Sequence, residues 1–310
     1  MLAHLLRRLY LLQVLGGVLL GAWVGTWVDI WQTHLTWPLV LLALVGAVLL
    51  PLTLHVLVIA CLMIVSWQPH ANWLWWRAFW GELVASLQIF WFHLPMAMSK
   101  PHVLPAYPAA SLGRQAGMPV VLVHGFICNH RVWDTLSVAL RQAGHPVLAL
   151  DLEPLFGSID LYVPLIAQGV QELLRQTDAH QVVLVGHSMG GLAIRAWLRD
   201  HGSARVARVI TLGTPHVGTP SACWVSTLPN AAQMVQHSAW LANLQRFEPP
   251  DIRALMHIAV SLQDNVVYPA SEQILSGVTV QFFEGMGHLQ LCQSPTVIDW
   301  VTGCCADCPV

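Results

Sequence analysis

A serine between glycines, Ser188, stands in the segment V-V-L-V-G-H-S-M-G-G (182–191). The Gly-x-Ser-x-Gly pattern follows an aliphatic run and precedes a segment with helical spacing, which predicts a sharp strand-to-helix turn that exposes the serine hydroxyl. Glycines on both sides leave room for neighbouring backbone, and the helix N-terminus favours developing negative charge. We therefore predict that Ser188 is a nucleophile; the alternative is a glycine-rich loop without a catalytic role.

A serine hydroxyl is a weak nucleophile until a base removes its proton. The order expected along such a chain is Ser, then Asp or Glu, then His. His288 lies in E-G-M-G-H-L, just after the predicted strand 278–283, and is the best candidate base among the sixteen histidines. His187 fits less well, because a direct neighbour of the serine cannot readily point back toward it.

The candidate acid is Asp264, in S-L-Q-D-N-V-V-Y-P directly after the predicted strand 257–262. At the C-terminal end of a strand, a carboxylate can orient an imidazole and stabilise the imidazolium. The alternatives are Asp251 among prolines, Asp299 inside the predicted last helix, and Glu284 close behind the preceding strand. The strand-end position favours Asp264.

A tetrahedral oxyanion needs two hydrogen-bond donors. One is expected from the residue after the nucleophile, the backbone N–H of Met189. The other is expected in the loop after the predicted strand 119–123, where the sequence is His124-Gly125-Phe126. We predict the Phe126 N–H as this donor, with Gly125 allowing close approach; a tight turn that binds nothing is the alternative.

These residues need a scaffold, and from residue 118 onward short apolar runs alternate with segments of helical spacing. The predicted strands are 119–123, 146–150, 181–185, 206–212, 257–262 and 278–283. The predicted helices are 131–142, 160–176, 189–199 and 295–301. Continuous Val and Leu runs suit strands buried on both faces. The fold class predicted is α/β, a doubly wound, mostly parallel sheet with helices on both faces.

Three segments carry a resemblance to a known family: H-G-F-x-x-N-x-x-x-W (124–133), G-H-S-M-G-G (186–191) and G-T-P-H-x-G-T (213–219). They resemble the α/β-hydrolase superfamily, more narrowly its bacterial triacylglycerol lipases and esterases, with likeness to the deacylases of lipid-anchored inositol. The resemblance covers about residues 118–303. It implies ester hydrolysis through an acyl-serine, with Ser188, Asp264 and His288 as nucleophile, acid and base, and Phe126 and Met189 as oxyanion donors.

The same resemblance implies an acyl pocket under a cap, here about residues 216–250. It places Thr214 and His216 near the site, and with His124, Gly125 and His187 they make up the candidate substrate pocket. The implied substrate is an acyl ester or lipid. We expect no cofactor and no metal, since the sequence has no convincing calcium site of the kind that some of these lipases carry.

The first hundred residues differ in composition from the rest. The chain of 310 residues is 55% hydrophobic and 10% charged, against about 25% charged in an ordinary soluble domain. Residues 1–100 hold only six of the thirty charged residues but ten of the fifteen tryptophans. The formal charge of −2 gives no basic footprint for nucleic acid. The pattern predicts a membrane segment followed by a globular domain.

Two uncharged runs, 9–28 and 39–67, are long enough to cross a bilayer, so residues 1–70 are predicted as an all-α transmembrane hairpin. A cleaved signal peptide is the alternative for the first, but the run is too long and no cleavage site follows. The tryptophan-rich segment 71–100 is predicted as a helix at the headgroup level, an anchor without a role in catalysis; a third crossing is the alternative.

The Lys and Arg residues near the spans predict a multi-pass protein of the inner membrane, with the catalytic domain on the cytoplasmic side; a third crossing would reverse the side. Residues 101–117 are predicted as a linker and 304–310 as a tail containing Cys304, Cys305 and Cys308. Free, reduced thiols are expected, because no second ligand cluster accompanies the three cysteines.

The function predicted is that of a membrane-anchored serine esterase or lipase. The same residues would also serve an acyltransferase, a thioesterase or an amidase, since spacing does not distinguish these reactions. A hydrolase-fold protein that has lost its activity and only binds at the membrane is the alternative from another class. The sequence does not reveal the oligomeric state, the head group or the acyl-chain length.

Overall fold

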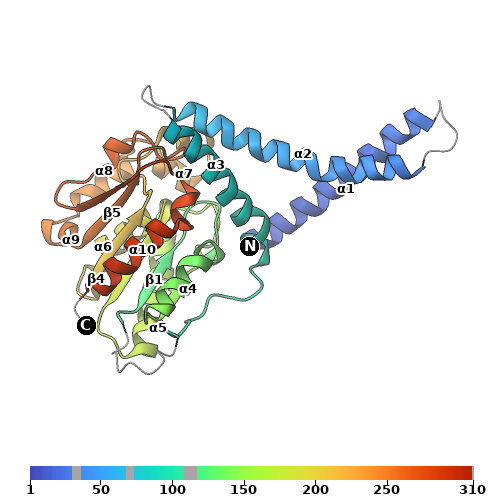
Figure 1. The fold of residues 1–310 in the computed structure, drawn as a ribbon. Helices are drawn as coiled ribbons and strands as arrows, with labels where there is room; N and C mark the ends of the chain where they lie inside the picture. The colour runs from blue at the N-terminus through green and yellow to red at the C-terminus, as the bar shows by residue number, and fades with distance from the viewer. Residues whose placement is uncertain (30–35, 68–72, 108–116, 309–310) are drawn as a thin grey trace.

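The chain is built around a six-stranded sheet in which every neighbouring pair is parallel, in the order β2-β1-β3-β4-β5-β6 (Figure 1). The computed structural model describes residues 1–29, 36–67, 73–107 and 117–308, without the side chains of residues 20–22 and 24–43. The strands are β1 (Val120–Val123), β2 (Val147–Ala149), β3 (Val182–His187), β4 (Val206–Leu212), β5 (Met256–Ser261) and β6 (Thr279–Phe283). The predicted parallel sheet and the order of its elements are confirmed.

Helices cover both faces of the sheet, as the continuous apolar strands require. Alternate residues of one strand enter separate cores: Val121 and Val123 face one side, and Val120 and Leu122 the other. The helices after β1 are α4 (Asp134–Gln142), α5 (Val163–Thr177), α6 (Met189–His201), α7 (Pro229–Met234), α8 (Ala239–Arg246), α9 (Pro250–Ala254) and α10 (Pro295–Ala306). The first two begin later than the pattern predicted, because 3-10 turns at His130–Trp133 and Ile159–Tyr162 precede them.

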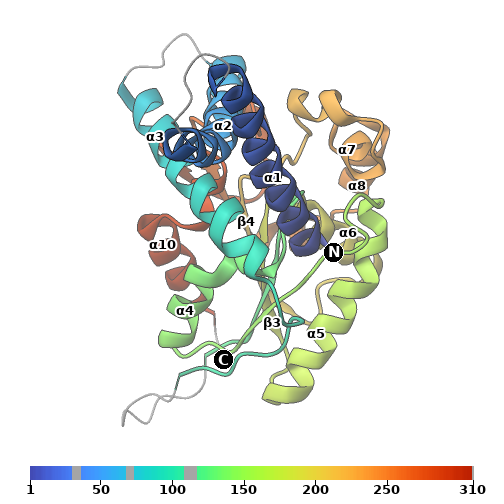
Figure 2. The ribbon, with the colours of Figure 1, turned by 90° about the vertical axis from the view of Figure 1, so that its right-hand side faces the viewer.

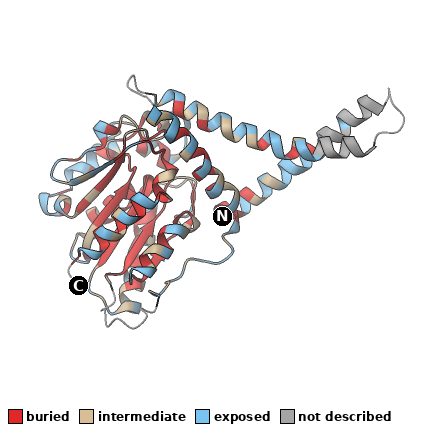
Figure 3. Cartoon of the chain, viewed as in Figure 1, coloured by how far each residue is buried: buried red, intermediate tan, exposed pale blue. Residues whose placement is uncertain are grey.

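Two long apolar helices, α1 (Leu2–Asp29) and α2 (Thr36–Val65), extend from this domain (Figure 1). They meet closely at Gly17, where a Cβ atom would lie 2.3 Å from the Ala47 Cα, and they diverge toward the domain. Figure 3 shows many exposed positions along them, in contrast to the buried sheet. By length and composition, two described helices are able to cross a membrane, over Leu2–Leu19 and Leu44–Val65. The turn between them lies outside the described residues.

The hairpin of α1 and α2 is not separate from the globular domain. The predicted division into a membrane segment followed by a globular domain did not include a contact between the two. The first turns of α1 pack into the core on one face of the sheet through Leu2 and Leu6. The Arg7 guanidinium donates to the Pro95 carbonyl at 2.6 Å. Figure 2 shows the start of α1 beside the end of the segment 73–96, where it contacts the 3-10 turn at residues 94–96. This contact could not be predicted from the sequence, because a packed apolar turn and a lipid-facing one have the same composition.

The tryptophan-rich segment contains α3 (Trp73–Leu87), a π-helical turn at Gln88–His93 and a 3-10 turn at Leu94–Met96. One face of α3 exposes Trp73, Trp76 and Trp80, as a helix at a membrane surface would. The opposite face packs on the 3-10 turn Leu289–Cys292 of the globular domain. The prediction of a purely interfacial helix is therefore incomplete.

The predicted C-terminal tail is wrong in its first part. Helix α10 continues to Ala306, and Cys304, Cys305 and Cys308 are buried in the core. A free cysteine behaves as a small apolar side chain, which explains this packing. All seven cysteines are unpaired. Part of the predicted linker, residues 108–116, lies outside the described residues, and Leu104 forms an isolated antiparallel bridge with Val147.

Candidate active site

Ser188 occupies the turn between β3 and α6, with φ 53° and ψ −126°. A positive φ is strained for a residue with a Cβ, and such strain persists only where the surroundings enforce it. Here a Cβ on Gly186 would lie 2.6 Å from the Gly191 nitrogen, and one on Gly190 would lie 2.1 Å from the Val123 oxygen. At both positions the neighbouring backbone thus leaves room only for glycine, and this allows the tight turn at Ser188.

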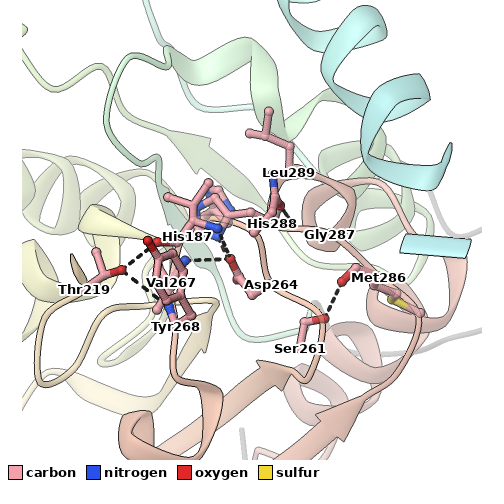
Figure 4. A network of polar contacts seen from close by, with 12 residues as sticks. His187, Thr219, Ser261, Asp264, Val267, Tyr268, Met286, Gly287, His288 and Leu289 are labelled. Atoms are coloured by element: carbon pink, nitrogen blue, oxygen red, sulfur yellow. Dashed lines mark hydrogen bonds and ion pairs between the residues drawn. The ribbon is translucent and has the colours of Figure 1, made fainter. Parts of the chain in front are cut away.

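His288 and Asp264 are in direct contact, although 24 residues separate them in the chain (Figure 4). The His288 Nδ1 lies 2.8 Å from the Asp264 Oδ2, and both side chains are buried. The other carboxylate oxygen accepts the N–H groups of Val266 (2.9 Å) and Val267 (2.7 Å). The Asn265 Oδ1 accepts the His288 N–H at 2.9 Å. This arrangement fixes the imidazole with Nδ1–H toward Asp264 and leaves Nε2 as the nitrogen able to take up a proton.

The pKa of His288 is raised. Burial by itself would lower this pKa. The adjacent Asp264 carboxylate, its hydrogen bond to the ring and the nearby Glu82 together outweigh burial and raise the pKa. A raised pKa makes the imidazole a stronger proton acceptor, which suits a general base near neutral pH.

Ser188 and His288 both line one cavity, of about 650 Å³. Among the described residues, no hydrogen bond joins the Ser188 hydroxyl to His288, and both residues line the same cavity. The segment after β4 contributes further lining through Pro215, Ala222 and Met234. A volume of this size suits a ligand of moderate size.

The loop after β1 approaches the serine closely. A Cβ on Gly125 would lie 2.8 Å from the Ser188 Cβ, so only glycine fits there. Phe126 follows and lines the cavity, and Ile127 has a φ of 53°, which is rare for a β-branched residue. Met189 begins α6, where the first N–H groups of a helix lack intrahelical partners. Of the two candidate oxyanion donors, Met189 directly follows Ser188, and Phe126 directly follows Gly125, which lies against Ser188.

Glu82 of α3 reaches the same site, and the sequence analysis missed it. Its two carboxylate oxygens accept the N–H groups of Leu289 (3.1 Å) and Gln290 (3.0 Å), the residues that directly follow His288. The side chain is 1% exposed, and burial raises its pKa to about 7, against the opposing effects of His288 and the two N–H groups. The only signal in the sequence was a single acid in an apolar, tryptophan-rich segment.

His187 lines the cavity, with its ring centroid 4.6 Å from that of His288. Its Nε2–H donates to the His288 carbonyl at 3.1 Å. Burial, with the nearby His288 charge, lowers the pKa of His187 well below its ordinary value, so the ring is neutral. It supports the backbone of His288 and does not reach back to the serine as a base.

Four of the five predicted pocket residues do not line this cavity: Gly125, which lies against Ser188, and His124, Thr214 and His216. His124 is buried, with Nδ1 donating to the Gly125 carbonyl and Nε2 accepting the Leu152 N–H, so it joins two loops. Thr214 packs against Gly191. His216 contacts the buried Arg195. The rings of His124 and His216 thus find hydrogen-bond partners in the interior, whereas the buried Thr214 hydroxyl has none among the described residues.

In the G-T-P-H segment, the residue that lies against Asp264 and His288 is the glycine. Gly213 has a φ of 54°, and a Cβ there would lie 3.0 Å from the Asp264 Oδ2 and 3.2 Å from the His288 Nδ1.

The three alternative acids, Asp251, Asp299 and Glu284, are all exposed. Among the described residues, no group of three His, Cys, Asp or Glu side chains is placed to hold a metal ion.

Comparison with known proteins places this geometry in a family context. Residues 118–260 match the family described as the alpha/beta hydrolase fold. A triacylglycerol lipase from Burkholderia plantarii is 34% identical over 131 residues, 39% of this chain and 36% of that protein. A putative non-heme chloroperoxidase from Synechocystis sp. is 32% identical over 102 residues, 31% of this chain and 37% of that protein. The matches thus span little more than a third of these relatives.

Solved structures agree in fold. The mature lipase BlEst2 of Bacillus licheniformis superposes with a TM-score of 0.54 at 17% identity, covering 66% of this chain and 98% of that one. Lipase B of Aspergillus fumigatus gives a TM-score of 0.54 at 17% identity, covering 64% and 55%. The chain therefore contains a domain of the α/β-hydrolase fold that is related to lipases, esterases and non-heme haloperoxidases.

Proposed function

We propose that this protein is a membrane-anchored serine hydrolase that cleaves carboxylic esters through an acyl-serine intermediate. Its catalytic domain is residues 118–303, with a cap at about 216–250. Ser188 is the nucleophile, His288 the base and Asp264 the acid. The observation that carries the proposal is the strained Ser188 turn, which opens into the same cavity as an imidazole bonded to a buried carboxylate.

The proposed reaction follows from this geometry. His288 Nε2 takes the proton of the Ser188 hydroxyl as the oxygen attacks the ester carbonyl, and the N–H groups of Phe126 and Met189 stabilise the oxyanion. The imidazolium, held by Asp264, returns the proton to the leaving alkoxide, and an acyl-serine remains. Water then attacks the acyl-serine by the same route and releases the carboxylic acid. In each of the two steps, the proton that His288 takes up is passed on to the leaving group, so His288 ends in its starting state.

The names of the lipase relatives and the apolar lining of the cavity favour an ester substrate over a halide. Ser188→Ala is expected to abolish hydrolysis of p-nitrophenyl esters and labelling by a fluorophosphonate probe. The matched control is Ser276→Ala, an exposed serine, which keeps both. Turnover by the Ser188→Ala variant would refute the proposal. Absent labelling of the parent protein would favour an inactive binding protein.

We also propose that α1 and α2 anchor the domain to a membrane, with the exposed tryptophan face of α3 at its surface. The Lys and Arg distribution favours the inner membrane and the cytoplasmic side. Cys223, an exposed thiol of the cap segment, tests this. A membrane-impermeant maleimide is expected to label Cys223 only after the inner membrane is permeabilised; labelling in cells with an intact inner membrane would place the domain on the other side.

A further inference from the structure

The cavity at Ser188 has a wall that the hydrolase fold does not supply. Helices α1 and α2 contribute much of its lining, although they precede the hydrolase domain in the chain. The lining residues from these helices include Leu9, Tyr10, Leu54, Val58, Ile59 and Leu62. The reacting hydroxyl and the two candidate membrane helices thus share one apolar space.

Two polar side chains in this wall, Tyr10 and His55, are hydrogen-bonded to the segment 73–96. The Tyr10 hydroxyl donates to the Phe90 carbonyl. The His55 Nε2 lies 2.9 Å from the Ser86 Oγ. These contacts fix α1 and α2 to the segment 73–96. Gln13 of α1 also lines the cavity, and the other lining residues of the two helices are mostly aliphatic, so most of the wall presents hydrocarbon to a ligand. A ligand with polar groups along its length would find few partners here.

The cavity lies where the two helices diverge. They meet closely at Gly17 and Ala47 and separate toward the domain, as Figure 1 shows. Leu54 is 51% exposed and also lines the cavity, so the cavity is open between the helices. Leu12 and Leu57 are exposed on the outside of the hairpin. In a bilayer, the opening would therefore face lipid and not water.

We infer that this space binds the long acyl chain of an ester lipid, which enters sideways from the bilayer between α1 and α2 with its ester group at Ser188. The inference rests on the proposed ester hydrolase function and adds the substrate class and its route. Lipid hydrocarbon is about as apolar as the cavity, so transfer between them contributes little affinity. The site selects by shape: a chain that cannot lie in the opening cannot align its ester for attack.

The test compares two substitutions of the same residue type on α2. Leu54→Trp fills the opening, and Leu57→Trp, on an exposed position that does not line the cavity, is the control. The full chain is assayed in lipid nanodiscs with p-nitrophenyl palmitate and butyrate. Leu54→Trp is expected to lower the palmitate-to-butyrate ratio of kcat/KM by at least about ten-fold, because misalignment of the ester is costly. Leu57→Trp is expected to keep the ratio. An unchanged ratio for Leu54→Trp, or an equal fall for both, overturns the inference.

A second measurement does not depend on turnover. The Ser188→Ala protein in nanodiscs is exposed to a palmitoyl ester with a photoactivatable chain end. Cross-links are expected on α1 and α2, and excess palmitoyl ester should suppress them. Cross-links confined to other parts of the chain would overturn the site. If the parent protein neither hydrolyses esters nor reacts with a fluorophosphonate, the proposed function fails, while the cross-link pattern still decides on the site.

Discussion

Replacing Glu82 by glutamine tests whether α3 positions His288, the proposed base. In the native structure the two Glu82 oxygens accept one N–H each, from Leu289 and Gln290, directly after His288. A glutamine side chain keeps the size and offers only one oxygen. One of the two N–H groups would then face an amide NH₂ and lose its acceptor.

The magnitude follows from the burial of this contact. A buried donor without a partner costs about 1–3 kcal/mol. If that cost is borne by the alignment of His288 in the transition state, kcat/KM falls between about 5-fold and about 150-fold. The loss of the Glu82 carboxylate also removes one of the causes that raise the pKa of His288. The acidic limb of the kcat/KM profile, where His288 becomes protonated, is therefore expected to move to lower pH.

Stability provides a separate measure of the same group. The pKa of Glu82 is about 7 in the folded chain, above its ordinary 4.5, so between these values the folded state binds more protons than the unfolded state. The contribution of Glu82 to stability therefore falls as the pH rises through this window, by an amount on the order of 3 kcal/mol. The melting temperature of the parent protein relative to Glu82→Gln is expected to fall between pH 4.5 and pH 7.

The assay is the pH dependence of ester hydrolysis by the full chain in detergent, with Glu284→Gln as the matched control. Glu284 is an exposed acid four residues before His288, and its substitution is expected to change neither the rate nor the profile. The reasoning is refuted if Glu82→Gln keeps the rate and the acidic limb of the parent protein. It is also refuted if Glu284→Gln shifts the limb as much, since the effect would then be one of general charge.

Three further predictions concern the remainder of the site and its support. Asp264→Asn is expected to lower kcat on the order of 10³- to 10⁴-fold and to lower the pKa of His288, seen as a shift of the acidic limb to lower pH. Gly125→Ala should reduce kcat on the order of 10²-fold with little change in KM, because its Cβ crowds the nucleophile; unchanged kinetics would exclude this loop from the site. Glu248→Ala leaves the buried Arg195 without its ion pair, and thermal melting should show a loss of about 3–5 kcal/mol; a loss below about 1 kcal/mol would contradict the pairing.

Local pattern was sufficient for much of the domain. The strand before Ser188, the turn and the helix after it occupy neighbouring positions in the chain, so their residue types specify them together. The same holds for the position of Asp264 just after β5 and of His288 just after β6. Parallel strands place their C-terminal ends at one edge of a sheet, and the order of strands and helices therefore sufficed to bring the two side chains together.

Packing over long chain separations decided the rest. His124, Thr214 and His216 have residue types suited to a site, but in the folded chain His124 and His216 bond to other buried groups and Thr214 packs against Gly191. Glu82 meets the loop after His288 across more than two hundred residues. No local pattern encodes such a contact, because it depends on how α3 lies on the domain.

The sequence by itself determined the fold class, the order of the elements, the strained serine turn and the two apolar helices, since each follows from composition or periodicity over a few neighbouring residues. The tertiary structure alone decided that these helices line the cavity at Ser188 and that an acid from the tryptophan-rich helix accepts the N–H groups directly after His288. Apolar residues facing lipid and apolar residues facing a cavity are chemically alike, and only their placement in space distinguishes them.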